Sequence, residues 1–148
     1  MMFERARSLG LAGGLEAEVY LDDLEILADP LVDRVFSILL DNTRRHGEKA
    51  TKVKVWHVIA GDALTIVYED DGVGIPPQDK ERIFEQGFGK DSGLGLFLAR
   101  QVLEVTGMTM QETGEWGQGA RFEVAVPHNR WRLVPNPPTA KEVHLAGA

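Results

Sequence analysis

Three polar side chains that could handle a phosphate group are grouped on one predicted helix. Asn42 precedes Arg45 by three positions and His46 by four, so all three project from one side of that helix. An amide oxygen is a suitable ligand for Mg²⁺, and the planar guanidinium group of arginine binds phosphate oxygens. The exposed side of an amphipathic helix has the same spacing, so the helix alone leaves both interpretations open.

A glycine-containing acidic segment follows a predicted strand and could bind a flat ring. Asp70 comes directly after the strand, and Gly72, Gly74 and Ile75 follow in the sequence Asp-Asp-Gly-Val-Gly-Ile-Pro. The two glycines permit a tight turn and a close approach of a ligand to the backbone. The carboxylate at the strand end could accept a hydrogen bond from a base amine. A plain acidic turn has the same composition and remains the alternative.

A third segment, residues 87–96, runs from a glycine-rich loop into a predicted helix with the sequence Gly-Phe-Gly-Lys-Asp-Ser-Gly-Leu-Gly-Leu. Unpaired backbone amides at a helix N-terminus, together with the helix dipole, attract anions such as phosphate. The chain contains neither the dinucleotide fingerprint Gly-x-Gly-x-x-Gly nor the phosphate loop Gly-x-x-x-x-Gly-Lys-Ser/Thr. The segment is therefore either a phosphate-binding loop or a glycine-rich helix cap.

The elements that must position these segments alternate between strands and helices. Apolar spacing predicts helices over residues 30–46, 76–84 and 94–105. Alternating runs predict strands at residues 16–21, 24–28, 51–59, 63–69, 109–113 and 120–126. Turn-like pairs at Asp22-Asp23 and Gly61-Asp62 predict that the first two strands form one hairpin and the next two another. We expect an α/β fold, a two-layer sandwich with three helices on one face of a mixed sheet.

Length and charge limit the classes of protein to consider. A chain of 148 residues is long enough for one packed domain, and glycine and proline positions place that domain at residues 15–132, with tails at 1–14 and 133–148. The net charge of -7 argues against a nucleic-acid partner. No apolar run approaches the about 20 residues that cross a bilayer. Because cysteine is also absent, we expect a cytoplasmic fragment, whether or not its parent protein is anchored in a membrane.

The order of these segments resembles the catalytic ATP-binding domain of sensor histidine kinases. That order is a helix with Asn42, a strand into Asp70-x-Gly-x-Gly, Ile83-Phe84-Glu85, the Gly-Leu-Gly-Leu stretch at 93–96, and Gly117-x-Gly119. The family shares a superfamily, and its Bergerat-type ATP-binding fold, with DNA gyrase, the Hsp90 chaperones and the MutL repair proteins. The resemblance covers about residues 18–127, and its specificity lies in the ordered set, since each motif alone is common.

The resemblance implies roles for the candidate residues. Asn42 would bind Mg²⁺, Arg45 and His46 would face the phosphates of ATP or ADP, and Asp70 would accept a hydrogen bond from the adenine amine. The other residues implied to bind the nucleotide are Gly72, Gly74, Ile75, Phe88, Lys90, Gly93, Leu94, Gly95 and Leu96. The activity implied is transfer of the γ-phosphoryl group of ATP to a histidine on a separate dimerisation domain of the same parent protein, which in turn serves a response regulator. A fragment without the dimerisation helices would be monomeric.

Two positions depart from the family pattern. Asp91 stands where the glycine stretch usually begins with one more glycine, and Ile38 stands where a polar residue is usual. Ile38 either faces the nucleotide or extends the apolar stripe of Val35 and Leu39. Since isoleucine can neither orient a water nor accept a proton, a nucleotide-gated binding module without phosphotransfer is one alternative function. A serine kinase of the anti-sigma-factor type is another, although such kinases usually carry glutamate at the position of Ile38.

Overall fold

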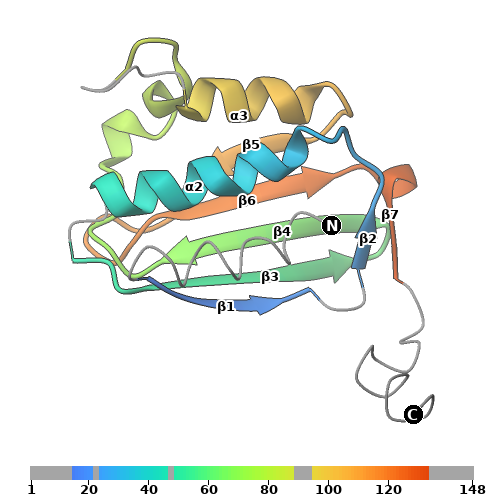
Figure 1. Cartoon of the computed structure of the whole chain (residues 1–148), viewed down its shortest axis with the longest axis horizontal. Helices are drawn as coiled ribbons and strands as arrows, with labels where there is room; N and C mark the ends of the chain where they lie inside the picture. The colour runs from blue at the N-terminus through green and yellow to red at the C-terminus, as the bar shows by residue number, and fades with distance from the viewer. Residues whose placement is uncertain (1–14, 22–23, 47–48, 89–94, 134–148) are drawn as a thin grey trace, which may run out of the picture.

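The computed structural model describes residues 15–21, 24–46, 49–88 and 95–133, and a five-stranded mixed sheet forms its base (Figure 1). Its strands, in spatial order, are β1 (Glu16–Tyr20), β3 (Lys52–Ala60), β4 (Ala63–Asp70), β6 (Arg121–Val126) and β5 (Thr109–Glu112). β1 pairs with β3 in parallel, and the other neighbours are antiparallel. β4 is therefore the central strand, and its last residue is Asp70.

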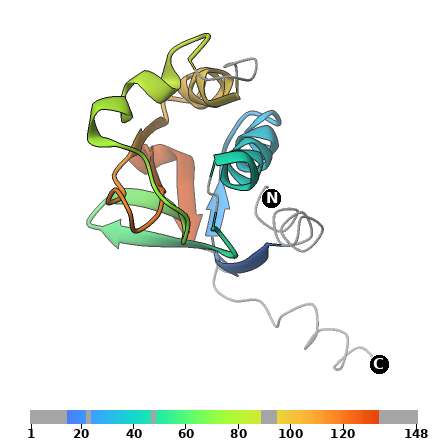
Figure 2. The ribbon, with the colours of Figure 1, turned by 90° about the vertical axis from the view of Figure 1, so that its left-hand side faces the viewer.

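Two α-helices, α2 (Val32–His46) and α3 (Gly95–Glu104), lie on the same face of the sheet (Figures 1 and 2). The third predicted helix, at residues 76–84, forms instead as two 3-10 turns, η1 (Pro77–Asp79) and η2 (Arg82–Phe84). The predicted two-layer α/β sandwich with a mixed sheet is confirmed. No helix within the described ranges is long and apolar enough to span a membrane.

The core lies between the two layers and is organised around an aromatic side chain of β4. The ring centroid of Tyr68 is 5.5 Å from that of Phe36 on α2 and 6.3 Å from that of Phe122 on β6. Phe84 of η2 packs edge-on against Phe122, so η2 contributes to the same face as α2 and α3. The inner side of β4 is thereby fully covered, and the polar end of Tyr68 must find its partners inside the protein.

One of the two predicted hairpins is wrong. β3 and β4 do form a hairpin, with Ala60 opposite Ala63 and Gly61 at a φ of 63°, a value that favours glycine. β1 and β2 (Leu24–Ile26) do not pair with each other. β1 joins the edge of the main sheet, while β2 pairs antiparallel with β7 (Trp131–Leu133), which follows the 3-10 turn η3 (His128–Arg130). The turn signal was local, whereas each strand's partner is set by tertiary packing, which overrides it.

Candidate nucleotide-binding site

The side chain of Asp70 is the most completely bound candidate group. It is only 4% exposed, at the end of β4. Its Oδ1 accepts hydrogen bonds from the backbone amides of Gly72, at 2.9 Å, and Ala120, at 3.0 Å. Its Oδ2 accepts one from the hydroxyl of Thr43, at 2.8 Å. An ionised carboxylate offers about four acceptor positions, so one position, on Oδ2, is left for a ligand.

The glycines around Asp70 permit two loops to pack against each other. Gly74 has a φ of 81°, and a Cβ on it would lie 2.9 Å from the carbonyl oxygen of Gly119. Gly119 has a φ of 136°, and its Cβ would lie 2.1 Å from the carbonyl oxygen of Asp70. The amide of Gly117 also donates to Val73, at 2.7 Å. Larger residues at Gly74 and Gly119 would therefore push the two loops apart.

Sequence reasoning missed two hydroxyl groups behind Asp70. Thr43 is buried on the sheet-facing side of α2, and its Oγ1 lies 2.7 Å from the hydroxyl of Tyr68. The hydroxyl of Tyr68 also lies 3.1 Å from the carbonyl oxygen of Leu39. Burial raises the pKa of Tyr68 far above its usual value, so its hydroxyl keeps its proton. The available signal was a threonine on the otherwise apolar stripe of α2.

The three candidates for phosphate and metal binding lie on the last turns of α2. Asn42 is half-buried, and its side chain forms no hydrogen bond with the residues that the structure describes. Arg45 is exposed, and its Nε lies 3.0 Å from Asp41 Oδ2, one helical turn earlier. His46 is exposed and ends the helix. Asn42 is next to Thr43 in the sequence, and Thr43 donates a hydrogen bond to Asp70. The end of α2 is therefore connected to the site around Asp70.

The predicted phosphate loop is described only in part. Lys90, Gly93 and Leu94 lie outside the described residues. Gly95 begins α3 and is exposed, and Leu96 is buried.

Three other residues singled out in the sequence are held by packing. Ile75 is half-buried and packs against the core. Phe88 is half-buried, with the guanidinium group of Arg82 5.1 Å from its ring centre. Ile38 is partly buried, and its Cγ2 lies 3.4 Å from where a Cβ on Gly95 would be. Ile38 therefore contacts both the core and the start of α3.

A second buried carboxylate fixes the far end of the loop that contacts Asp70. The side chain of Glu112, at the end of β5, is fully buried and forms an ion pair with Lys80. Its Oε2 accepts from the amides of Gly114 and Arg121, both at 3.0 Å. Lys80 also donates to the carbonyl oxygen of Gly114, at 2.7 Å. The loop at residues 113–121 is therefore held by Glu112 on one side and by Asp70 on the other.

The exposed side chain of Asp71 closes the connection between α2 and β3. Its Oδ1 accepts from the amides of Thr51, at 2.8 Å, and Lys52, at 3.0 Å, and its Oδ2 accepts from the Thr51 hydroxyl, at 2.8 Å. Partial burial raises the pKa of Asp71, but the hydrogen bonds from Lys52 and Thr51 outweigh it and hold the pKa below its usual value. Asp70 and Asp71, although adjacent, thus organise different loops.

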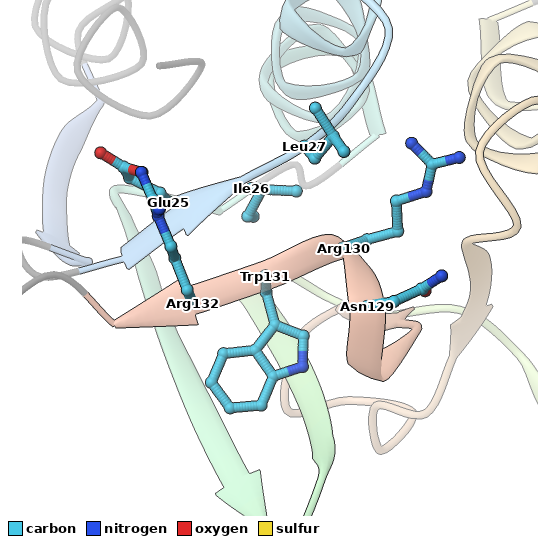
Figure 3. Close-up of a pocket in the computed structure, with 7 residues that line it drawn as sticks. All are labelled: Glu25, Ile26, Leu27, Asn129, Arg130, Trp131 and Arg132. Atoms are coloured by element: carbon cyan, nitrogen blue, oxygen red, sulfur yellow. The ribbon is translucent and has the colours of Figure 1, made fainter.

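A groove of about 350 Å³ lies elsewhere, on β2, η3 and β7 (Figure 3). Its lining consists of Glu25, Ile26, Leu27, Asn129, Arg130, Trp131 and Arg132. Arg132 donates to Glu25 at 2.7 Å across the strand pair. Trp131 donates to Asp62 in the β3–β4 turn, which is at the opposite end of β4 from Asp70. The groove contains none of the predicted site residues.

Comparison with known proteins defines the class. Residues 28–130 match the family model described as histidine kinase-, DNA gyrase B-, and HSP90-like ATPase, so the chain belongs to this family. The alginate biosynthesis sensor protein KinB of Pseudomonas aeruginosa is 35% identical over 101 residues, which are 65% of this chain and 17% of KinB. The sensor protein RstB of Escherichia coli is 32% identical over 115 residues, which are 71% of this chain and 25% of RstB. The chain thus spans a quarter or less of these relatives.

Solved structures of other proteins share the fold of this chain. The mycobacterial sensor histidine kinase MprB superposes with a TM-score of 0.69 at 26% identity, over 85% of this chain and 89% of that one. Full-length ShkA in complex with AMPPNP superposes with a TM-score of 0.70 at 22% identity, over 99% of this chain and 36% of that one. The chain is an ATP-binding catalytic domain of the sensor histidine kinase type.

Proposed function

We propose that this domain holds adenine at Asp70 and Mg-ATP phosphates beside Asn42, and transfers the γ-phosphoryl group to a histidine on a separate dimerisation domain of its parent protein. A response regulator would receive the phosphoryl group from that histidine. The observation that carries the proposal is the buried Asp70 carboxylate, which has three donors from the protein and one acceptor position left. An acceptor-only group at that position fits the exocyclic amine of adenine and disfavours the carbonyl oxygen of guanine.

The residues at the end of α2 fit a magnesium site in which the phosphates of the nucleotide supply ligands that the protein does not. Mg²⁺ in nucleotide sites usually keeps several waters and takes only one or two protein ligands, with phosphate oxygens as the rest. The described ranges hold no cluster of three or more His, Cys, Asp or Glu side chains for a metal, whereas the Asn42 amide has no hydrogen bond to described residues. Asn42 would therefore be a single protein ligand, and the ion would neutralise charge on the transferring phosphoryl group.

Phosphoryl transfer suits this set of residues because it depends on positioning and charge neutralisation more than on covalent chemistry. Arg45 and His46 would face the phosphates once a nucleotide is bound, together with Lys90, which precedes α3 in the sequence. Gly93, Leu94, Gly95 and Leu96 would form the start of the helix beneath them. The acceptor histidine is proposed on another segment, since the described histidines end α2 (His46), lie within β3 (His57) or open η3 (His128).

The second candidate function is a nucleotide-gated module that binds ATP without transferring phosphate. Ile38 favours it, because this isoleucine of α2 lies against the first residue of α3 and supplies no group that could handle a proton. Incubation of the chain with γ-labelled ATP and a separately supplied acceptor domain separates the two functions. Label on the acceptor histidine supports the kinase, and bound nucleotide without label transfer supports the module.

The adenine contact is tested with Asp70→Asn. The asparagine oxygen can still accept from Gly72 and Ala120, but its amide group replaces the acceptor Oδ2 with a donor. Because a hydrogen bond to a charged group contributes about 1.5–3 kcal/mol, ADP affinity should fall roughly ten- to a hundredfold. Calorimetric titration measures it, with Asp62→Asn in the exposed β3–β4 turn as the control. Equal ADP affinity of Asp70→Asn and wild type would exclude Asp70 as the adenine ligand.

We further propose that residues 15–132 are the functional unit and that it is monomeric, because dimerisation would belong to the separate helical domain. Sedimentation of the chain with and without ADP measures its mass. A dimer would contradict this part of the proposal.

A further inference from the structure

The hydroxyl groups behind Asp70 form a connected chain whose proton positions can be deduced. The carboxylate of Asp70 only accepts hydrogen bonds from Gly72 and Ala120, because their backbone amides can donate but cannot accept. Each hydroxyl carries one proton, so when Thr43 donates to Oδ2 of Asp70, it has none left for Tyr68. The 2.7 Å contact between the two hydroxyls is then a bond donated by Tyr68. The resulting order is Tyr68 to Thr43 to Asp70.

The carbonyl oxygen of Leu39 also competes for the Tyr68 proton, but it is more distant, at 3.1 Å, than the hydroxyl of Thr43, at 2.7 Å. Burial keeps Tyr68 protonated, so this residue cannot reverse the direction by becoming an acceptor only. The ring of Tyr68 is held by edge contacts with Phe36 and Phe122. The chain of hydroxyls therefore starts from a group whose position and protonation are both fixed by the core.

We propose that Thr43 is a specificity-determining positioning residue, and that its hydroxyl, oriented by Tyr68, aims the free acceptor position of Asp70 Oδ2 at the base amine of a bound adenine nucleotide. The inference rests on the proposed adenine site. Thr43 uses one acceptor position of Oδ2, which restricts where the other can point. Oδ1 does not need a side-chain donor to orient it, because two backbone amides already donate hydrogen bonds to it.

Thr43 and Tyr68 could instead serve only to satisfy each other inside the core. In that case their loss would lower stability and weaken all nucleotides alike. If they orient Asp70, their loss must weaken specifically those nucleotides that carry the 6-amine. The decisive quantity is therefore the ratio of affinities for ADP and for purine riboside 5′-diphosphate, which lacks that amine.

The experiment measures this ratio by calorimetry for the full chain, for Thr43→Val and for Thr43→Ser. Valine matches threonine in shape but has no hydroxyl, and serine keeps the hydroxyl. Thr43→Val should lower the ratio roughly fivefold, the equivalent of one hydrogen bond, and Thr43→Ser should restore it. Thr65→Val, on the same strand as Asp70 but on the sheet face away from α2, is the matched control and should leave the ratio unchanged.

Tyr68→Phe provides the second measurement, and it decides the question if Thr43→Val does not fold. It keeps the aromatic packing and removes only the hydroxyl, so the ratio should fall in the same direction by roughly twofold. Tyr20→Phe, on the exposed side of β1, is its control. A wild-type preference for ADP that survives in both Thr43→Val and Tyr68→Phe would overturn the role proposed for Thr43 and leave the proposed adenine site standing. A wild-type chain with no preference for ADP would overturn the adenine site itself, and the inference with it.

Discussion

The ion pair between Lys80 and Glu112 makes a strong prediction about stability. The Glu112 side chain is 0% exposed and that of Lys80 is 26% exposed, so the pair is largely removed from water. In Lys80→Met the Glu112 carboxylate would keep its two backbone donors but lose its counter-charge. Removal of one partner of a buried pair costs about 3–5 kcal/mol. We expect the lower end, about 3 kcal/mol, because the remaining amides partly compensate the charge.

A loss of this size is easily measured. At roughly 4 °C per kcal/mol for a domain of this length, the melting temperature should fall by roughly 12 °C. The companion variant Glu112→Gln removes the charge but keeps an acceptor for Gly114 and Arg121. The double variant Lys80→Met/Glu112→Gln should therefore be more stable than Lys80→Met alone, because no unpaired charge remains buried.

Urea denaturation followed by circular dichroism gives the four free energies of unfolding for this double-mutant cycle. Lys54→Met, on exposed β3 surface, is the control and should change the free energy of unfolding by less than about 0.5 kcal/mol. The reasoning is refuted if Lys80→Met is as stable as the Lys54→Met control. It is equally refuted if the double variant loses the sum of the two single losses, since the two side chains would then not interact.

Three further predictions concern the nucleotide site and its loops. Asn42→Ala should weaken Mg-ADP more than metal-free ADP in a fluorescent-nucleotide assay, whereas Asn129→Ala, at the other end of the sheet, should keep the wild-type response to Mg²⁺. Ile38→Glu should raise slow ATP hydrolysis at least roughly tenfold while ADP affinity stays near wild type; a lower melting temperature with unchanged turnover per folded molecule would instead assign Ile38 to the core alone. Asp71 has a lowered folded-state pKa, so its stabilising effect is present above the unfolded pKa and disappears as pH falls through the folded value. The stability advantage of wild type over Asp71→Asn, measured by urea denaturation, should therefore shrink between neutral pH and about pH 3, and a constant difference over this range would show that the carboxylate charge is irrelevant.

Local patterns in the sequence predicted most of the elements that form the site. The apolar stripe of α2, the Gly61-Asp62 turn and the acid at the end of β4 each follow from short-range chemistry, and the structure has all three. The pairing of β1 and β2 could not be predicted in this way. Both strands have partners distant in the sequence, and a turn-like pair of aspartates between them carries no information about those partners.

The side chains that organise the site also depend on distant contacts. Thr43 meets Asp70 from 27 positions away, and Lys80 meets Glu112 from 32 positions away. Their types alone were uninformative, because threonine and lysine are common on helices and turns. A polar residue at a position that the periodicity assigns to the core is the usable sign, and both Thr43 on α2 and Glu112 on β5 fit it.

The pairing of β2 with β7 has a consequence for synthesis of the protein. Glu25 and Arg132, which face each other on these strands, are 107 positions apart. At translation rates of about 5–20 residues per second, β2 leaves the ribosome roughly 5 to 20 seconds before its partner exists. During that interval its backbone donors and acceptors are unpaired, and an unpaired strand is open to association with other chains. The main sheet has all five of its strands once β6 has been made, so this small two-stranded sheet is the last part of the nascent domain to be completed.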